Sequence, residues 1–244
     1  MPKTAWLTLC HKRPQLLQLI DRQRKAVDPT SVLALTLDRP TTDVIRAVER
    51  VQRDSPESVV VNNAPFPALD TVERFNELRN WQVDQLRDYN PKYFVIFDDD
   101  AIFASAGAFR RALGSTLDPD VVYATKYFLW DGLDRINQRL PRHRSSVAFK
   151  IRPGETFPPL NMDETRRPSD TIFADVRSPL LDIGYLTEAD RRRCFDAYKR
   201  VGKIDAATLP LVKEPQLAYW MPRDRTEIAN VRRIARALKL KSPF

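Results

Sequence analysis

The stretch Tyr93-Phe-Val-Ile-Phe-Asp-Asp-Asp100 decides the fold, because five apolar or aromatic residues run directly into three consecutive aspartates. A short, continuous apolar run of this kind predicts a strand that is buried on both faces. Similar runs precede it at 5–10, 31–38 and 58–63, and a helical pattern follows each of them. Parallel strands need crossover connections and are covered on both faces, so this alternation predicts an α/β fold with a mostly parallel sheet flanked by helices.

The remaining elements follow from the spacing of apolar residues, caps and turn residues. Helices are predicted around 14–20, from a cap at Thr41 or Thr42 to Val51, and from about 70 to 89. After residue 105 the pattern loosens. The elements predicted there are a helix at 106–113, a strand at 121–125, a functional loop with some strand at 131–170, a helix at 187–201 ended by Gly202, a short strand at 203–212 and a basic amphipathic helix at 226–240.

Length and composition exclude several classes of protein. The 244 residues are 43% hydrophobic, enough to bury a core and too many for a disordered chain. We expect a main domain over 1–215, with a nucleotide-binding half at 1–105 and an acceptor half at 106–215, and a helical extension at 216–244. With only 6 glycines the chain has no glycine-rich phosphate loop, which disfavours dinucleotide and P-loop binding.

The chain is basic, and its excess charge is concentrated near the C-terminus. The net charge is +8, and residues 191–244 hold 14 basic against 5 acidic residues. Such a segment points to an anionic partner. No stretch approaches the length of a membrane span or a signal peptide, and Cys10 and Cys194 stand far apart, so we expect a cytoplasmic protein without a disulfide.

Polar residues follow each predicted strand, at 11–13, Asp38, 62–63 and 98–100. The carboxyl ends of parallel strands meet at one edge of a sheet, where ligands of such folds bind. Three adjacent carboxylates repel one another, and a hard divalent cation such as Mg²⁺ or Mn²⁺ would relieve that repulsion. Asp98 and Asp100 are expected to point the same way along the strand, and Asp99 the other way. The alternative is an acidic turn that caps the next helix.

Five parts in order carry a resemblance to a known family: Leu7-Thr-Leu-Cys-His-Lys-Arg-Pro14, Asp38, Arg79-Asn80, Phe94-Val-Ile-Phe-Asp-Asp-Asp100, and Leu181-Asp-Ile-Gly-Tyr-Leu-Thr-Glu-Ala-Asp-Arg-Arg-Arg193 followed by Gly202, Lys203 and Pro210. Together they resemble the nucleotide-sugar glycosyltransferases of the GT-A fold, in particular inverting enzymes with an Asp-X-Asp metal motif. The resemblance implies a GT-A (Rossmann-like) sheet flanked by helices, with Arg79-Asn80 opening the helix before the metal strand.

The resemblance also implies roles for individual residues. Asp98 and Asp100 would hold Mn²⁺ or Mg²⁺, and the donor would be a nucleotide-diphosphate sugar, with UDP the commonest nucleotide. The residues implied in donor binding are Thr8, Cys10, His11, Arg13, Asp38, Arg79, Asp98 and Asp99. The family has adjacent Glu and Asp where Ala189 separates the two here, so the general base stays open among Asp190, Glu188 and Asp182, in that order.

The basic C-terminal residues bear on the acceptor. Arg191, Arg192, Arg232, Arg236 and Lys239 form a candidate nucleic-acid surface that would bind phosphates without sequence preference. The acceptor could then be a hydroxymethylated base in DNA, as for some phage enzymes, which would act in the host cytoplasm. The alternatives are a solubilising or lipid-binding surface, a nucleic-acid-binding module on an inactive GT-A-like scaffold, and a nucleotidyltransferase. The stereochemical outcome and the oligomeric state stay open.

Overall fold

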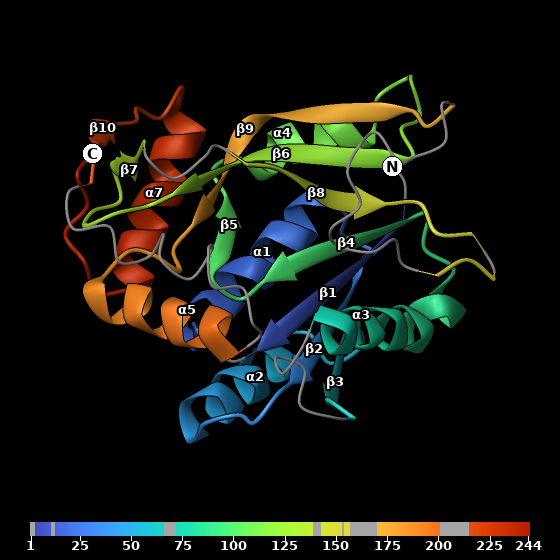
Figure 1. Cartoon of the computed structure of the whole chain (residues 1–244). Helices are drawn as coiled ribbons and strands as arrows, with labels where there is room; N and C mark the ends of the chain where they lie inside the picture. Colours follow the sequence, from blue (N-terminus) through green and yellow to red (C-terminus); the bar gives the residue numbers. More distant parts are fainter. Residues whose placement is uncertain are drawn as a thin grey trace.

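The computed structural model describes residues 3–10, 13–65, 72–138, 143–152, 154–156, 170–200 and 215–244. Its centre is an eight-stranded sheet with the order β3-β2-β1-β4-β8-β6-β9-β5 (Figure 1). In this order the strands are Val59–Asn63, Val32–Leu37, Thr4–Cys10, Tyr93–Asp98, His143–Phe149, Val121–Phe128, Phe173–Asp182 and Ala101–Phe103. Four of the seven neighbouring pairs in this part of the chain are parallel, which confirms the predicted α/β class and mostly parallel sheet.

Helices cover both faces of the parallel part of the sheet (Figure 1). Strand β1 shows why, because Trp6 packs with α1 and α2 whereas Ala5 and Leu7 pack with α3. A strand covered on both faces is apolar throughout, as its sequence is. The helical elements are η1 (Pro14–Leu16), α1 (Leu17–Val27), α2 (Thr42–Asp54), α3 (Val72–Leu86), η2 (Arg87–Tyr89), α4 (Ala106–Leu113), α5 (Glu188–Arg200) and α7 (Arg225–Ala237).

Local signals place the helices where the sequence predicts them. The hydroxyl of Thr41 accepts a hydrogen bond from the Val44 amide at the start of α2, which confirms the predicted cap. The last helix begins after Asp224, whose carboxylate accepts from the amides of Thr226 and Glu227. It ends at Ala237, three residues earlier than predicted. No helix in the described ranges is long and apolar enough to cross a membrane.

The second half of the sheet contains most of the strands that the apolar pattern of the sequence did not predict. Strands β5 and β9 were not predicted, and the 131–170 region contains β7 (Arg135–Asn137) and β8. These strands pair with partners that are distant in the sequence and mostly antiparallel, so one face is more polar and the apolar run is broken. The predicted strand at 203–212 and the cap at Gly202 lie outside the described residues.

The C-terminal segment is built into the same body. Strand β10 (Leu217–Tyr219) pairs with β7, and Val231, Ile234 and Ala235 of α7 belong to the main hydrophobic cluster. The exposed side of α7 carries the predicted basic residues, so the helix docks through its apolar face.

Candidate active site

The carboxyl ends of the parallel strands form one rim of the sheet. Leu9 lies opposite Asp98, Cys10 lies opposite Leu37, and Leu37 lies opposite Asn63. This register places the ends of β1, β2, β3 and β4 side by side (Figure 1). The rim is the position at which such sheets bind ligands.

The three aspartates form a tight connection between two strands. β4 ends at Asp98, Asp99 and Asp100 make a turn, and β5 begins at Ala101. Asp99 is fully buried, and its Oδ2 accepts a hydrogen bond from the Arg13 amide at 3.0 Å. Asp98 and Asp100 instead lie near the same lysine, Lys126. The expected separation of Asp99 from the other two is therefore present, although a turn and not a continued strand produces it.

Arg79 fixes the orientation of Asp98. Its guanidinium lies 2.9 Å from Oδ1 of Asp98 and also donates to Oε1 of Gln82 at 2.8 Å. The Arg79 side chain is fully buried, and burial lowers its pKa while the charge of Asp98 opposes that shift. The prediction that Arg79 and Asn80 open the helix is wrong, because both lie in the middle of α3. A fully buried Arg79 positions Asp98 and has no surface open to a donor phosphate.

A second acidic segment reaches the first through the pairing of β5 with β9. Ala101 lies opposite Asp182, and the Ile183 amide donates to the Asp100 carbonyl at 2.8 Å. Gly184 then packs directly against the carboxylates. A Cβ at this position would lie 2.6 Å from Oδ2 of Asp100 and 3.0 Å from Oδ1 of Asp182. Only glycine leaves room for both side chains.

Lys126 of β6 is the cation among these carboxylates. Its ammonium lies 2.8 Å from Oδ2 of Asp182. Burial alone would lower the pKa of Lys126, but the charges of Asp182, Asp98 and Asp100 outweigh it, and the pKa is raised. The sequence did not predict Lys126 as a site residue. The one available signal was a lysine inside an otherwise apolar and aromatic strand, and it does not reveal which residues surround it.

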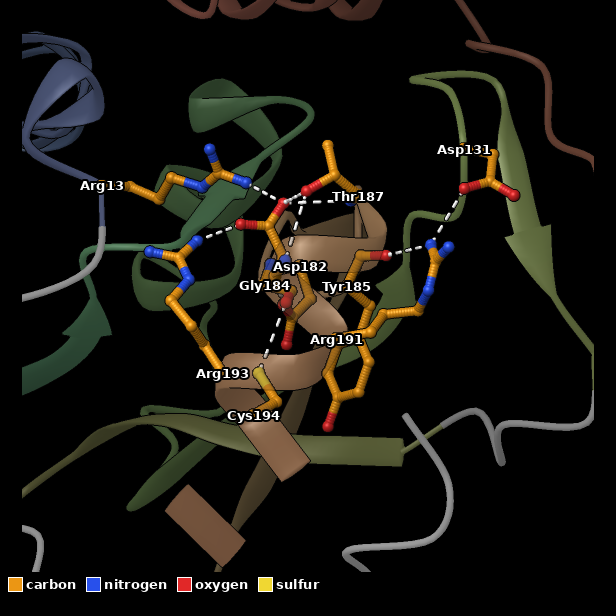
Figure 2. Close-up of polar contacts among 10 residues, drawn as sticks. Arg13, Asp131, Asp182, Gly184, Tyr185, Thr187, Arg191, Arg193 and Cys194 are labelled. Carbon is orange, nitrogen blue, oxygen red and sulfur yellow. Dashed lines mark hydrogen bonds and ion pairs between the residues drawn. The ribbon is translucent and has the colours of Figure 1, made fainter. Parts of the chain in front are cut away.

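Arg13, just before η1, lies near Thr187 and near Arg193 of α5 (Figure 2), because all three contact Asp190. Oδ2 of Asp190 pairs with the Arg13 guanidinium and its Oδ1 with that of Arg193. The Thr187 hydroxyl and amide donate to Oδ2 at 2.6 and 3.0 Å. Both oxygens of this buried carboxylate are therefore engaged.

The other two candidate bases have different surroundings. Glu188 is on the surface, with 70% of its side chain exposed, and pairs with Arg192 one turn later. Asp182 is buried between the Gly184 amide and Lys126. Asp190 is linked to the β1–η1 loop through its ion pair with Arg13.

The remaining predicted donor residues differ in accessibility. Thr8 and Cys10 are completely buried, and burial, followed by the charge of Asp99, raises the pKa of the Cys10 thiol. Asp38 is mostly buried at the end of β2 and pairs with Arg39 at 3.3 Å. The side chains of Thr8, Cys10 and Asp38 are therefore packed under the rim and are not exposed on its surface. His11 lies outside the described residues.

The predicted nucleic-acid residues fall into two groups. Arg191 stacks 4.2 Å from the centre of the Trp130 ring and pairs with Asp131, while Arg192 pairs with Glu188. Arg232 and Arg236 instead lie exposed on α7, and Lys239 lies exposed just after it. The structure thus separates the α5 arginines, which have carboxylate partners, from the basic residues of α7.

The carboxylates at the rim fit a metal ion only if another ligand completes its coordination. No group of three or more His, Cys, Asp or Glu side chains in the described ranges is arranged to hold a metal ion. Mg²⁺ and related cations, however, are often held by one or two carboxylates together with substrate phosphates. Asp98 keeps 37% of its side chain exposed while Arg79 engages Oδ1, whereas Asp100 is buried and, like Asp98, lies near Lys126. One partly exposed carboxylate with a second, buried one at the same lysine fits a cation that binds together with a diphosphate.

Comparisons with known proteins give structural likeness only, since no protein-family model and no curated protein matches the chain. The mannosyltransferase PcManGT from Pyrobaculum calidifontis, in complex with GDP-Man and Mn²⁺, is 14% identical, with 98% of this chain and 74% of that chain covered and a TM-score of 0.47. S. aureus TarS 1–349 in complex with UDP is 10% identical, with 99% and 73% covered and a TM-score of 0.49. HddC from Yersinia pseudotuberculosis is 12% identical, with 79% and 97% covered and a TM-score of 0.44. At these scores the likenesses carry no conclusion about the activity or ligands of this chain.

Proposed function

We propose that the protein is a GT-A-type glycosyltransferase that moves a sugar from a nucleotide-diphosphate donor to an acceptor hydroxyl. One observation carries the proposal. Two acidic segments more than 80 residues apart meet around one lysine, at the rim where the parallel strands end. A diphosphate leaving group needs positive charge and oriented carboxylates at such a rim. The family resemblance of the same segments makes UDP the first nucleotide to test.

Asp98 and Asp100 are the residues that would hold Mn²⁺ or Mg²⁺. A divalent ion there would supply Lewis-acid stabilisation of the charge that develops on the leaving diphosphate. Arg79 keeps Asp98 oriented through a buried ion pair. Lys126 already neutralises part of the carboxylate charge.

Asp190 is the proposed general base. Its oxygens are held by Arg13 and Arg193, so neither oxygen is open to an acceptor hydroxyl while both ion pairs are in place. A donor diphosphate offers these guanidinium groups a competing anion, and Arg is suited to bidentate phosphate contact. Transfer of one guanidinium to the diphosphate would free an Asp190 oxygen for the acceptor hydroxyl proton, and attack on the opposite face of the sugar would invert the anomeric configuration.

The finer proposal for the acceptor is a hydroxymethylated base in DNA. The exposed basic residues of α7 support a polyanionic partner. A base would have to leave the stack to reach the rim. The competing proposals are an inactive scaffold that binds nucleic acid and a nucleotidyltransferase.

The first experiment is a thermal-shift panel with UDP, GDP, CDP and dTDP, each with and without Mn²⁺. It uses the parent protein, an Asp98→Asn, Asp100→Asn variant, and Asp88→Asn as a control at an exposed position away from the rim. A ligand at about a hundred times its dissociation constant stabilises the native state by roughly 2.7 kcal/mol. We expect one nucleotide with Mn²⁺ to shift the parent and the control but not the rim variant. No shift with any nucleotide would refute the transferase proposal.

A further inference from the structure

A basic groove lies on the helical side of the molecule, between η1, α1, α2 and α7. Its volume is about 660 Å³. Five exposed cationic side chains line it, against one carboxylate, and they come from α1, α2, α7 and the segment just after α7. The charged lining residues are Arg22, Arg50, Arg233, Arg236, Lys239 and Asp43.

The five cations of the basic groove form no ion pair with a carboxylate in the described part of the chain. Arg50 and Arg236 donate only to backbone carbonyls of their own helices, and Arg233 donates to the Asn230 amide oxygen. Elsewhere in the molecule cations do find carboxylates, as Arg144 does with Asp175. Like charges that gather in a concave surface raise the local potential and attract anions. The groove therefore has charge that the protein itself does not neutralise.

The groove is extended. A second cavity of about 250 Å³, between α1, α4 and α7, shares Leu19, Arg22 and Arg233 with it and adds Arg110. The cations come from α1, α2, α7 and the residues just after α7, so they are spread over several elements. A single phosphate would meet only part of this row of charges. A nucleic-acid strand carries one phosphate per nucleotide, so several of its phosphates can meet these cations at once.

The lining residues also indicate how the ligand would be held. No aromatic side chain lines either cavity in the described residues, so bases would have no surface on which to stack. Contact would be to the backbone, without sequence preference and with strong salt dependence. A recessed row of charges suits a strand better than the flat surface of a membrane.

We propose that the basic groove binds the phosphodiester backbone of a single-stranded nucleic acid through Arg22, Arg50, Arg233, Arg236 and Lys239. Pro14, which follows Arg13 in the chain, is one of the lining residues, so the groove adjoins the loop that also contributes to the rim. This inference goes beyond the proposed transfer reaction, because strand binding needs none of the rim carboxylates.

The test measures binding of a fluorescent oligothymidylate of about 12 nucleotides by anisotropy, over about 50 to 200 mM salt. The groove variant is Arg233→Ala, Arg236→Ala. The control is Arg46→Ala, Arg53→Ala, which removes the same charge from exposed positions of α2 that do not line the groove. For two lost phosphate contacts we expect affinity to fall roughly 25-fold at about 0.1 M salt, and the slope of log K against log salt to decrease by about 1.4.

The outcomes separate the groove from general surface charge and from the transferase proposal. A control variant that loses as much affinity as the groove variant, or a parent that binds no oligonucleotide at low salt, overturns the proposal. Binding to inorganic polyphosphate or to anionic vesicles but not to the oligonucleotide also overturns it, and would identify a different polyanion. Both variants keep the nucleotide thermal shift if the rim is intact, and Asp98→Asn, Asp100→Asn keeps oligonucleotide binding, so each proposal can fail by itself.

Discussion

The rim and the basic groove adjoin each other at the start of η1, where Arg13 belongs to the rim and Pro14 lines the groove, but their positive charges are compensated in different ways. At the rim, Arg13, Arg79 and Lys126 are buried or half-buried, and each pairs with a carboxylate. In the groove, the cations are exposed, and within the described chain none pairs with a carboxylate. The rim is thus preorganised by its own ion pairs, whereas the groove depends on an anion from outside.

This difference has consequences for stability. A charge in a buried pair cannot be removed without leaving its partner uncompensated. Removal of an exposed cation that lies among like charges should change the free energy of unfolding little, because its main effect is to reduce repulsion. The following substitutions test whether the two regions differ in this way.

The largest effect is expected for Lys126→Met. Removal of the ammonium leaves Asp182 buried without its cation, beside Asp98 and Asp100, and should lower the free energy of unfolding by about 3–5 kcal/mol. Urea unfolding measures this loss. Mn²⁺ should restore part of it, because a divalent ion can replace the missing charge. A variant as stable as the parent would show that the carboxylates do not need Lys126.

The second comparison sets Arg79→Met against Arg233→Met. Arg79 is fully buried, but its partner Asp98 is partly exposed, so we expect a loss near the lower end of the range for broken buried pairs, about 3 kcal/mol. Arg233 in the groove should change stability by less than about 0.5 kcal/mol. Equal losses measured by urea unfolding would remove the distinction between rim and groove.

Gly184→Ala probes the packing of the rim without changing its charge. The added methyl would meet Oδ2 of Asp100 at 2.6 Å, so the carboxylate or the backbone has to move. We expect a loss of about 1–3 kcal/mol, as for overpacked sites, together with weaker Mn²⁺-dependent nucleotide binding. Gly107→Ala is the matched control, because its new Cβ would meet no atom closer than 3.7 Å. A similar result for both would argue against a crowded rim.

The sequence predicted the first half of the sheet because burial on both faces makes each parallel strand a continuous apolar run, such as 93–97. It also predicted the two acidic segments that meet at the rim. It could not predict Lys126 or Gly184 as their partners, since those contacts depend on the pairing of β5 with β9, which joins residues about 80 positions apart. The basic groove could not be predicted from the sequence for the same reason. Helices α1, α2 and α7 meet only through the tertiary fold, although the basic face of α7 was visible in the sequence.

The smallest expected effect is on the pKa of an ion-paired carboxylate that, unlike those of the rim, is exposed to solvent. Hydrogen bonds from Lys92 and then Lys150 lower the pKa of Asp118 from its ordinary value of 3.8 to about 2. The sign follows from linkage, because a carboxylate with a lowered folded pKa stabilises the native state above its unfolded pKa and loses that contribution as the pH falls through its folded pKa. Here the window lies between 3.8 and about 2. Lys150→Met should raise the pKa of Asp118 in a carboxyl NMR titration, and about 1 M salt should do the same in the parent, because exposed pairs are screened. If the pKa of Asp118 did not change with salt concentration, this ion pair would be shielded from solvent like the ion pairs of the rim. Solvent exposure would then not explain the difference between the two kinds of ion pair.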